Sequence, residues 1–123
     1  MPAIARGNVE LVGATGSATI DTGFHPHLIT VFMTAANSTV GTTGTSFGSA
    51  FDGPSLAQGS VFATDGGPNF TANNGLSNSA VGQSGSPSAQ LTLTSIADTG
   101  FSYAWQKETG TVGVNFHWLA YRR

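Results

Sequence analysis

Two histidines separated by one proline, His25 and His27, are the first residues in this sequence whose types and spacing could do chemistry. In an extended segment, side chains two residues apart point to the same side, so both imidazoles could bind a divalent metal with His117 as a third ligand. No glutamate or second carboxylate follows at short spacing, as it does in the metal-binding cupins. Because Pro26 lies where a strand is expected to begin, we interpret the segment as a structural corner and predict no metal and no cofactor.

Nucleophilic and acid–base catalysis find little support in the sequence. Serine is abundant, but no Gly-x-Ser-x-Gly elbow is followed by an acid and a histidine in hydrolase order. The carboxylates are scattered through turns and strand ends, and no two of them make a persuasive general acid and base. They are Glu10, Asp21, Asp52, Asp65, Asp98 and Glu108. We therefore predict that the protein is not an enzyme.

Aromatic side chains could stack on sugar rings if they were exposed. The available rings are Tyr103, Trp105, Trp118 and Tyr121. Strand alternation places Trp105 and Trp118 on apolar faces, where core burial is favoured over ligand stacking. Tyr121 falls on the opposite face from Trp118 and is the better candidate for an interface.

The composition favours docking over chemistry. Charged residues are 8% of the chain, against about 25% in an average soluble domain. A polar but nearly uncharged surface gives little repulsion between molecules, which suits a subunit that docks in many copies. The basic residues, Arg6, Lys107, Arg122 and Arg123, are too few to drive nucleic-acid binding, so nucleic acid is not an expected partner.

Neither a membrane nor an oxidising compartment is expected. Residues 1–6 lack the basic flank and apolar run of a signal peptide, so the protein is expected to be made in the cytoplasm. The longest strongly apolar stretch, residues 28–33, is too short to span a bilayer. Cysteine is absent, so no disulfide can supplement the core.

Glycine and turn dipeptides recur along the chain, with β-branched or aromatic runs between them, and no window shows helical spacing. A chain of 123 residues has about the length of one domain. We predict a single all-β domain, an antiparallel β-sandwich of jelly-roll-like type. The expected strands are residues 8–12, 18–21, 28–35, 46–51, 60–63, 89–96, 101–107 and 111–121.

The sequence also predicts four local features of this fold. Residues 28–35 carry apolar side chains on both faces and are expected to form a central strand. Residues 69–88 are expected to form an exposed excursion. The last two strands are expected to form a hairpin through residues 108–110. The tetrapeptide Asp-Thr-Gly-Phe occurs at 21–24 and 98–101, where we expect glycine to supply an unusual backbone angle and phenylalanine to enter the core.

Several runs together resemble a family of phage and prophage virion β-sandwich proteins. They are a Gly-Phe-His-Pro corner at 23–26 with the hydrophobic strand after it, Ser-Phe-Gly-Ser-Ala at 46–50, a Gly-Phe strand from Gly100, and an aromatic-Leu-Ala end at 116–121. The resemblance covers nearly the whole chain. A similar outline occurs in H-type lectin domains, which form trimers. These motifs are core and corner signatures, so they indicate fold more strongly than role.

The resemblance implies a bacteriophage virion structural protein located in the virion. With no coiled-coil stalk or second domain in the sequence, we expect a capsid decoration (cement) protein that stabilises the outer shell. The alternative is a tail, fibre or spike module that binds a receptor or glycan. The expected partners are itself, as a homotrimer, and the major capsid protein or another virion protein. The candidate interface residues are Asn69, Asn73, Asn74, Tyr121, Arg122 and Arg123.

Overall fold

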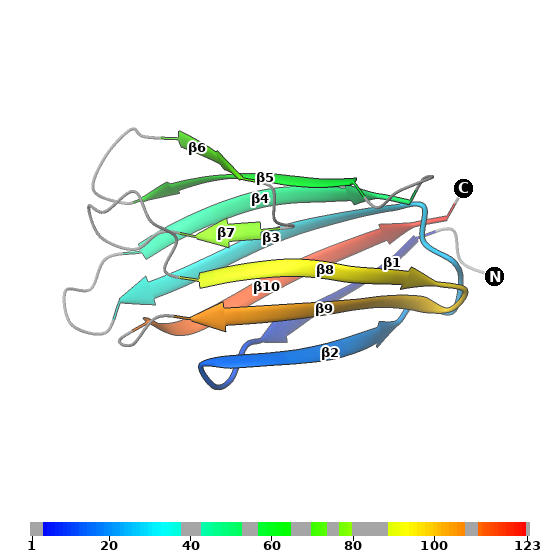
Figure 1. Cartoon of the computed structure of the whole chain (residues 1–123), viewed down its shortest axis with the longest axis horizontal. Helices are drawn as coiled ribbons and strands as arrows, with labels where there is room; N and C mark the ends of the chain where they lie inside the picture. Colours follow the sequence, from blue (N-terminus) through cyan, green and yellow to red (C-terminus); the bar gives the residue numbers. More distant parts are fainter. Residues whose placement is uncertain are drawn as a thin grey trace.

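The fold is an antiparallel β-sandwich, as the alternation in the sequence predicts. The computed structural model describes residues 4–37, 43–52, 57–64, 70–73, 77–79, 89–107 and 111–122. The described residues form strands in two sheets that lie face to face, joined by turns (Figure 1). No helix in these ranges is long and apolar enough to cross a membrane.

The larger sheet has six strands and the smaller has four. In spatial order the larger contains β1 (Ile4–Glu10), β10 (Thr111–Tyr121), β3 (Leu28–Asn37), β4 (Thr43–Phe51), β5 (Ala57–Thr64) and β6 (Phe70–Asn73). The smaller contains β2 (Thr15–Asp21), β9 (Gly100–Lys107), β8 (Ala89–Ala97) and β7 (Ser77–Ser79). The expected strands are therefore present, most of them longer than predicted.

The core fills the space between the two sheets. Alternate residues of the central strands are buried, including Ile29, Val31 and Met33 of β3 and Leu91 and Leu93 of β8. Aromatic rings from β9 and β10 meet edge to face between the sheets. The centroids of Phe101 and Trp118 are 5.5 Å apart, and those of Tyr103 and Phe116 are 5.2 Å apart. Such pairs add to the stabilisation that burial alone provides.

The predicted hairpin between the last two strands is wrong. β9 belongs to the smaller sheet and β10 to the larger, so the chain crosses from one sheet to the other between them. Each strand has one apolar face that must be covered. Packing these faces against each other buries both of them. Pairing the two strands side by side would instead leave one wide apolar face that another element must cover.

Two other expectations are partly corrected. β3 is a central strand, as predicted, but its second apolar face is turned outward and Phe32 is exposed. Within residues 69–88, predicted as an excursion, the structure places β6 at the edge of the larger sheet and β7 at the edge of the smaller. The remaining residues of that segment lie outside the described ranges. Short polar strands show too weak an alternation to be recognised from sequence.

Each edge strand along one side of the sandwich has a glycine covered by a tryptophan. Trp118 of β10 lies against Gly7 of β1, where an added Cβ would come within 2.6 Å of the indole Nε1. Trp105 of β9 lies against Gly16 of β2, where an added Cβ would come within 2.2 Å of the ring. Both rings face inward, as predicted; Trp118 is buried, and Trp105 is half-buried against the core. The glycines make room for rings that close this edge of the core.

The two copies of the Asp-Thr-Gly-Phe tetrapeptide lie side by side at one end of the smaller sheet. Thr22 and Gly23 donate their backbone N–H groups to the carbonyl of Thr99, at 2.9 Å and 3.3 Å. Phe24 and Phe101 are buried, as predicted. The glycines have different tasks, however. Gly23 has φ +78°, as expected, whereas Gly100 is not in the left-handed region and instead lets the β2 backbone approach closely.

Candidate interaction surface

The outer face of the larger sheet exposes several large apolar side chains. Phe32 of β3 and Phe47 and Phe51 of β4 have exposed fractions of 45%, 53% and 51%. Ile4 and Leu119 are also exposed on this face. Large apolar side chains gathered on one face of a soluble domain typically mark a contact surface. We call these five residues, with the half-buried Leu28 and Tyr121, the aromatic face.

Strand register explains why these side chains lie together. Phe32 of β3 is paired directly with Phe47 of β4. Four residues away along the same two strands, Leu28 is paired with Phe51. Tyr121 is paired with Leu28 on one side and Ile4 on the other. One row of apolar residues therefore crosses four neighbouring strands. Cross-strand pairs at this spacing touch one another, so the row forms a continuous apolar surface.

The outer face of the smaller sheet has the opposite character. It carries hydroxyls, amides and small side chains on β2, β8 and β9. Thr19 and Ser102 share a hydroxyl–hydroxyl hydrogen bond of 2.8 Å, and Gln106 donates to the Gln90 side-chain carbonyl at 2.9 Å. Hydroxyl and amide groups of this kind can also form hydrogen bonds with solvent water. The two outer faces thus divide into an apolar one and a neutral polar one.

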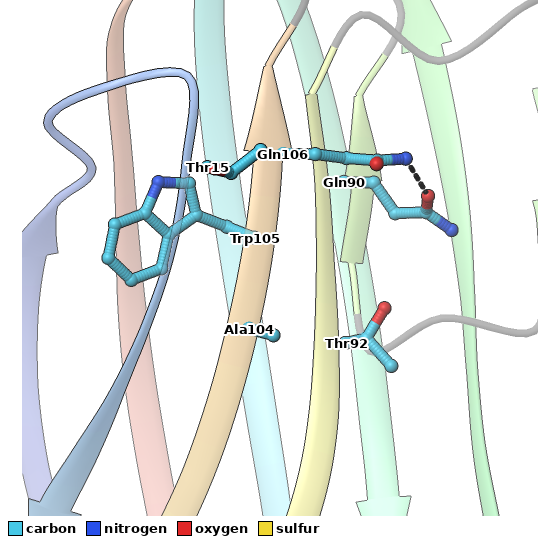
Figure 2. Close-up of a pocket in the computed structure, with 6 residues that line it drawn as sticks. All are labelled: Thr15, Gln90, Thr92, Ala104, Trp105 and Gln106. Carbon is cyan, nitrogen blue, oxygen red and sulfur yellow. Dashed lines mark hydrogen bonds between the residues drawn. The ribbon is translucent and has the colours of Figure 1, made fainter.

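A shallow groove of about 200 Å³ lies on the smaller sheet. Figure 2 shows its lining, with the bonded Gln90 and Gln106 on one side and the Trp105 ring turned away toward β2. The Trp105 Nε1 is buried without a hydrogen-bond partner among the described residues. The amides and hydroxyls of this groove are groups that can bond the hydroxyls of a sugar, whereas the Trp105 ring packs against the core and is not presented for stacking. Thr15, Thr92 and Ala104 complete the groove.

At one end of the sandwich His25 joins the two sheets. Its Nε2 donates to the carboxylate of Asp52, which follows β4 in the larger sheet. Its Nδ1 donates to Asp98, in the turn between β8 and β9 of the smaller sheet, at 3.3 Å. A carboxylate only accepts hydrogen bonds, so both contacts together require a proton on each ring nitrogen. The arrangement therefore favours the imidazolium. The hydrogen bond to Asp52 is the main cause that raises the pKa of His25, and desolvation opposes it.

This contact predicts a pH-dependent stability. Because the pKa of His25 is higher in the folded state than its ordinary value near 6.5, its contribution is complete below about pH 6.5 and is lost as pH rises through the raised value. We expect wild type to melt above a His25→Gln variant at pH 5.5–6, and the difference to shrink by pH 9. Thermal unfolding of both proteins across this range measures it. A difference that stays constant with pH would contradict the prediction.

The histidines considered as metal ligands do not converge. His25 directs its two nitrogens to carboxylates on opposite sides of its ring, and His117 lies on the outer face of the larger sheet beside Phe32. No group of three or more histidine, aspartate or glutamate side chains in the described ranges could hold a metal ion. The corner itself is held by the backbone: His27 N–H donates to the Tyr121 carbonyl at 2.7 Å, and the His27 carbonyl accepts from Asp52 N–H at 3.0 Å.

The predicted interface residues are only partly placed. Tyr121 is half-buried on the aromatic face, and Arg122 is exposed directly after β10. Asn73 ends β6, with β3, β4 and β5 between it and β10, so the structure does not bring it to Tyr121. Asn69, Asn74 and Arg123 lie outside the described residues.

The residues that dominate this surface were not singled out from the sequence. Phe47 and Phe51 are four residues apart on a strand, so they share a face, and the sequence contained that signal. Their pairing with Phe32 and Leu28 depends on which strands are neighbours. Comparison with known proteins supplies no family: no family model matches the chain, and no curated protein matches it.

Proposed function

We propose that this protein is a non-catalytic virion structural protein, a capsid decoration (cement) protein that docks on the outside of an assembled phage shell. The observation that supports this proposal is the aromatic face. Its central pair, Phe32 and Phe47, is about half exposed, whereas the rings of Phe101 and Phe116 between the two sheets are almost fully buried. The virion context comes from the resemblance of the corner and strand motifs.

The energetics of the aromatic face suit docking. Full burial of a phenylalanine side chain contributes roughly 1.5–3 kcal/mol, so covering one that is about half exposed contributes roughly half as much, and several together supply a useful affinity. The charged residues of this face within the described ranges, Arg6 and Glu10, lie on the edge strand β1 and leave the centre uncharged. A partner can therefore cover the centre without burying an unpaired charge. The homotrimer expected from the sequence belongs to the same proposal, because several weak contacts on one shell reinforce one another.

The test uses particles that lack the protein, to which purified protein is added back. Wild type is expected to bind and to raise the melting temperature of the shell. A Phe32→Ser, Phe47→Ser variant should stay folded, because both rings are exposed, but bind at least about tenfold more weakly. The matched control is Thr19→Ala with Ser102→Ala, which removes a hydroxyl pair on the opposite outer face and should bind like wild type.

Equal binding by the phenylalanine variant would contradict the docking face. Depleted particles that are as robust as complete ones would contradict the cement role. The second candidate function, a receptor- or glycan-binding module, is favoured by the polar groove that Gln90 and Gln106 line. It predicts that depleted particles keep their stability but no longer adsorb to host cells, and that Gln106→Ala weakens binding to glycans.

A further inference from the structure

The free edge of the larger sheet is the part of the molecule best suited to contact a second copy of the chain. β1 is seven residues long and contains no proline, and among the described strands it pairs only with β10, on one side. The edges formed by β6 and β7 are four and three residues long. Natural proteins usually shorten, bend or block an exposed edge, because its backbone groups offer pairing to another strand.

The backbone groups that β1 presents at this edge can be assigned. Leu11 N–H donates to the Val114 carbonyl of β10 at 2.8 Å. In an antiparallel ladder the hydrogen-bonded pairs alternate, so Val9, Gly7 and Ala5 also bond toward β10. The N–H and C=O groups of the alternate residues point the other way. These residues are Ile4, Arg6, Asn8 and Glu10.

The side chains of these same residues are self-complementary. Arg6 and Glu10 are placed symmetrically about Asn8, and all three are exposed. We propose that β1 pairs with β1 of a second copy across a two-fold axis through Asn8, with Arg6 of each copy opposite Glu10 of the other. The contact is isologous, so the attractive pair of Arg6 with Glu10 forms twice, once on each side of the two-fold axis.

Three other registers are worse for identifiable reasons. Centring the pair on Arg6 or on Glu10 would place like charges opposite each other, which is destabilising. Centring it on Gly7 would place Ile4 opposite a carboxylate. The Asn8 register instead places Ile4 opposite Val12, which lies two residues beyond the end of β1 and is 75% exposed. β2, the edge of the smaller sheet with the same length, carries only the charge of Asp21 and cannot form such a pair with itself.

The contact has a consequence for the aromatic face. The two-fold axis of an antiparallel strand pair is perpendicular to the sheet, so the larger sheets of the two copies become one continuous sheet with their outer faces on the same side. Two aromatic faces then point in one direction. The contact itself is independent of the proposed function, because it is formed by the protein alone in solution.

Charge reversal tests the pairing. Wild type should form species with an even number of chains in analytical ultracentrifugation, two or, if the trimer also forms, six. Arg6→Glu alone and Glu10→Arg alone should each weaken this association by at least about tenfold, because both attractive pairs become repulsive. Mixing the two variants should restore it, because every pair across the axis is then again Glu opposite Arg. Failure of the mixture to associate, or a wild type that stays monomeric or forms trimers without dimers or hexamers, would overturn the proposal.

A cross-link provides a second readout that does not depend on charge. The chain has no cysteine, so a single introduced thiol can react only with its own kind. Asn8→Cys places two thiols opposite each other with Cα atoms about 5.5 Å apart, within the range for a disulfide. This variant should oxidise to a covalent dimer much faster than Ser17→Cys, at the middle of the β2 edge. Equal rates for the two variants would contradict pairing through β1.

Discussion

Replacing Trp118 by alanine is expected to lower the free energy of unfolding by about 3–5 kcal/mol, the range for removing a large aromatic side chain from a core. The indole is only 8% exposed, meets Phe101 edge to face across the sandwich, and covers Gly7 of the edge strand β1. Its loss would leave a cavity between Phe101 and Gly7. A loss of this size is a large part of the stability of a small domain.

Tyr121→Ala is the matched control, because this aromatic residue lies three positions further along β10 on the outer face. It is half-buried there and is expected to lose less than about 1.5 kcal/mol. Denaturant unfolding followed by circular dichroism measures both variants. A Trp118→Ala protein that kept the wild-type midpoint would show that the orientation of β10 is wrong.

Gly100→Ala is expected to destabilise the fold by about 1–3 kcal/mol, the usual cost of forcing extra atoms into a packed site. An added Cβ would lie 1.9 Å from the Ile20 carbonyl oxygen and 3.2 Å from the Asp21 Cα. These are backbone atoms of β2, which cannot turn aside as the end of a flexible side chain can. The strand would have to move, and the Thr22 N–H bond to the Thr99 carbonyl would move with it.

Gly23→Ala tests the other copy of the same tetrapeptide. Nothing lies within 4 Å of a Cβ added there, but φ is +78°, so the cost is the left-handed backbone alone, about 1–2 kcal/mol. Thermal unfolding should show cooperative melting for both variants. Asparagine at each position separates the effect of positive φ from that of steric contact, because asparagine tolerates positive φ. Gly23→Asn should therefore be more stable than Gly23→Ala, whereas Gly100→Asn should be no more stable than Gly100→Ala. Equal rescue at both positions would contradict the distinction.

The fold class and most strand positions could be predicted because they depend on local pattern. Ile29, Val31 and Met33 alternate with residues of the other face, and the same period of two places Phe101, Tyr103 and Trp105 together on β9. The two-residue period also separated Trp118 from Tyr121 correctly. The corner at Pro26 and the burial of Phe24 and Phe101 followed from turn chemistry.

Which strands are neighbours was decided only by the tertiary structure. Adjacent strands with a short turn usually form a hairpin, yet β9 and β10 lie in opposite sheets because each needs its apolar face covered. The contact of His25 with Asp52 and Asp98 joins residues 27 and 73 positions apart, and no local pattern indicates it. The aromatic face likewise exists only because β3 pairs with β4 in a register that sets Phe32 beside Phe47. Local sequence determines which residues share a face of one strand, but a surface spanning several strands depends on pairings that are set by burial of the whole core.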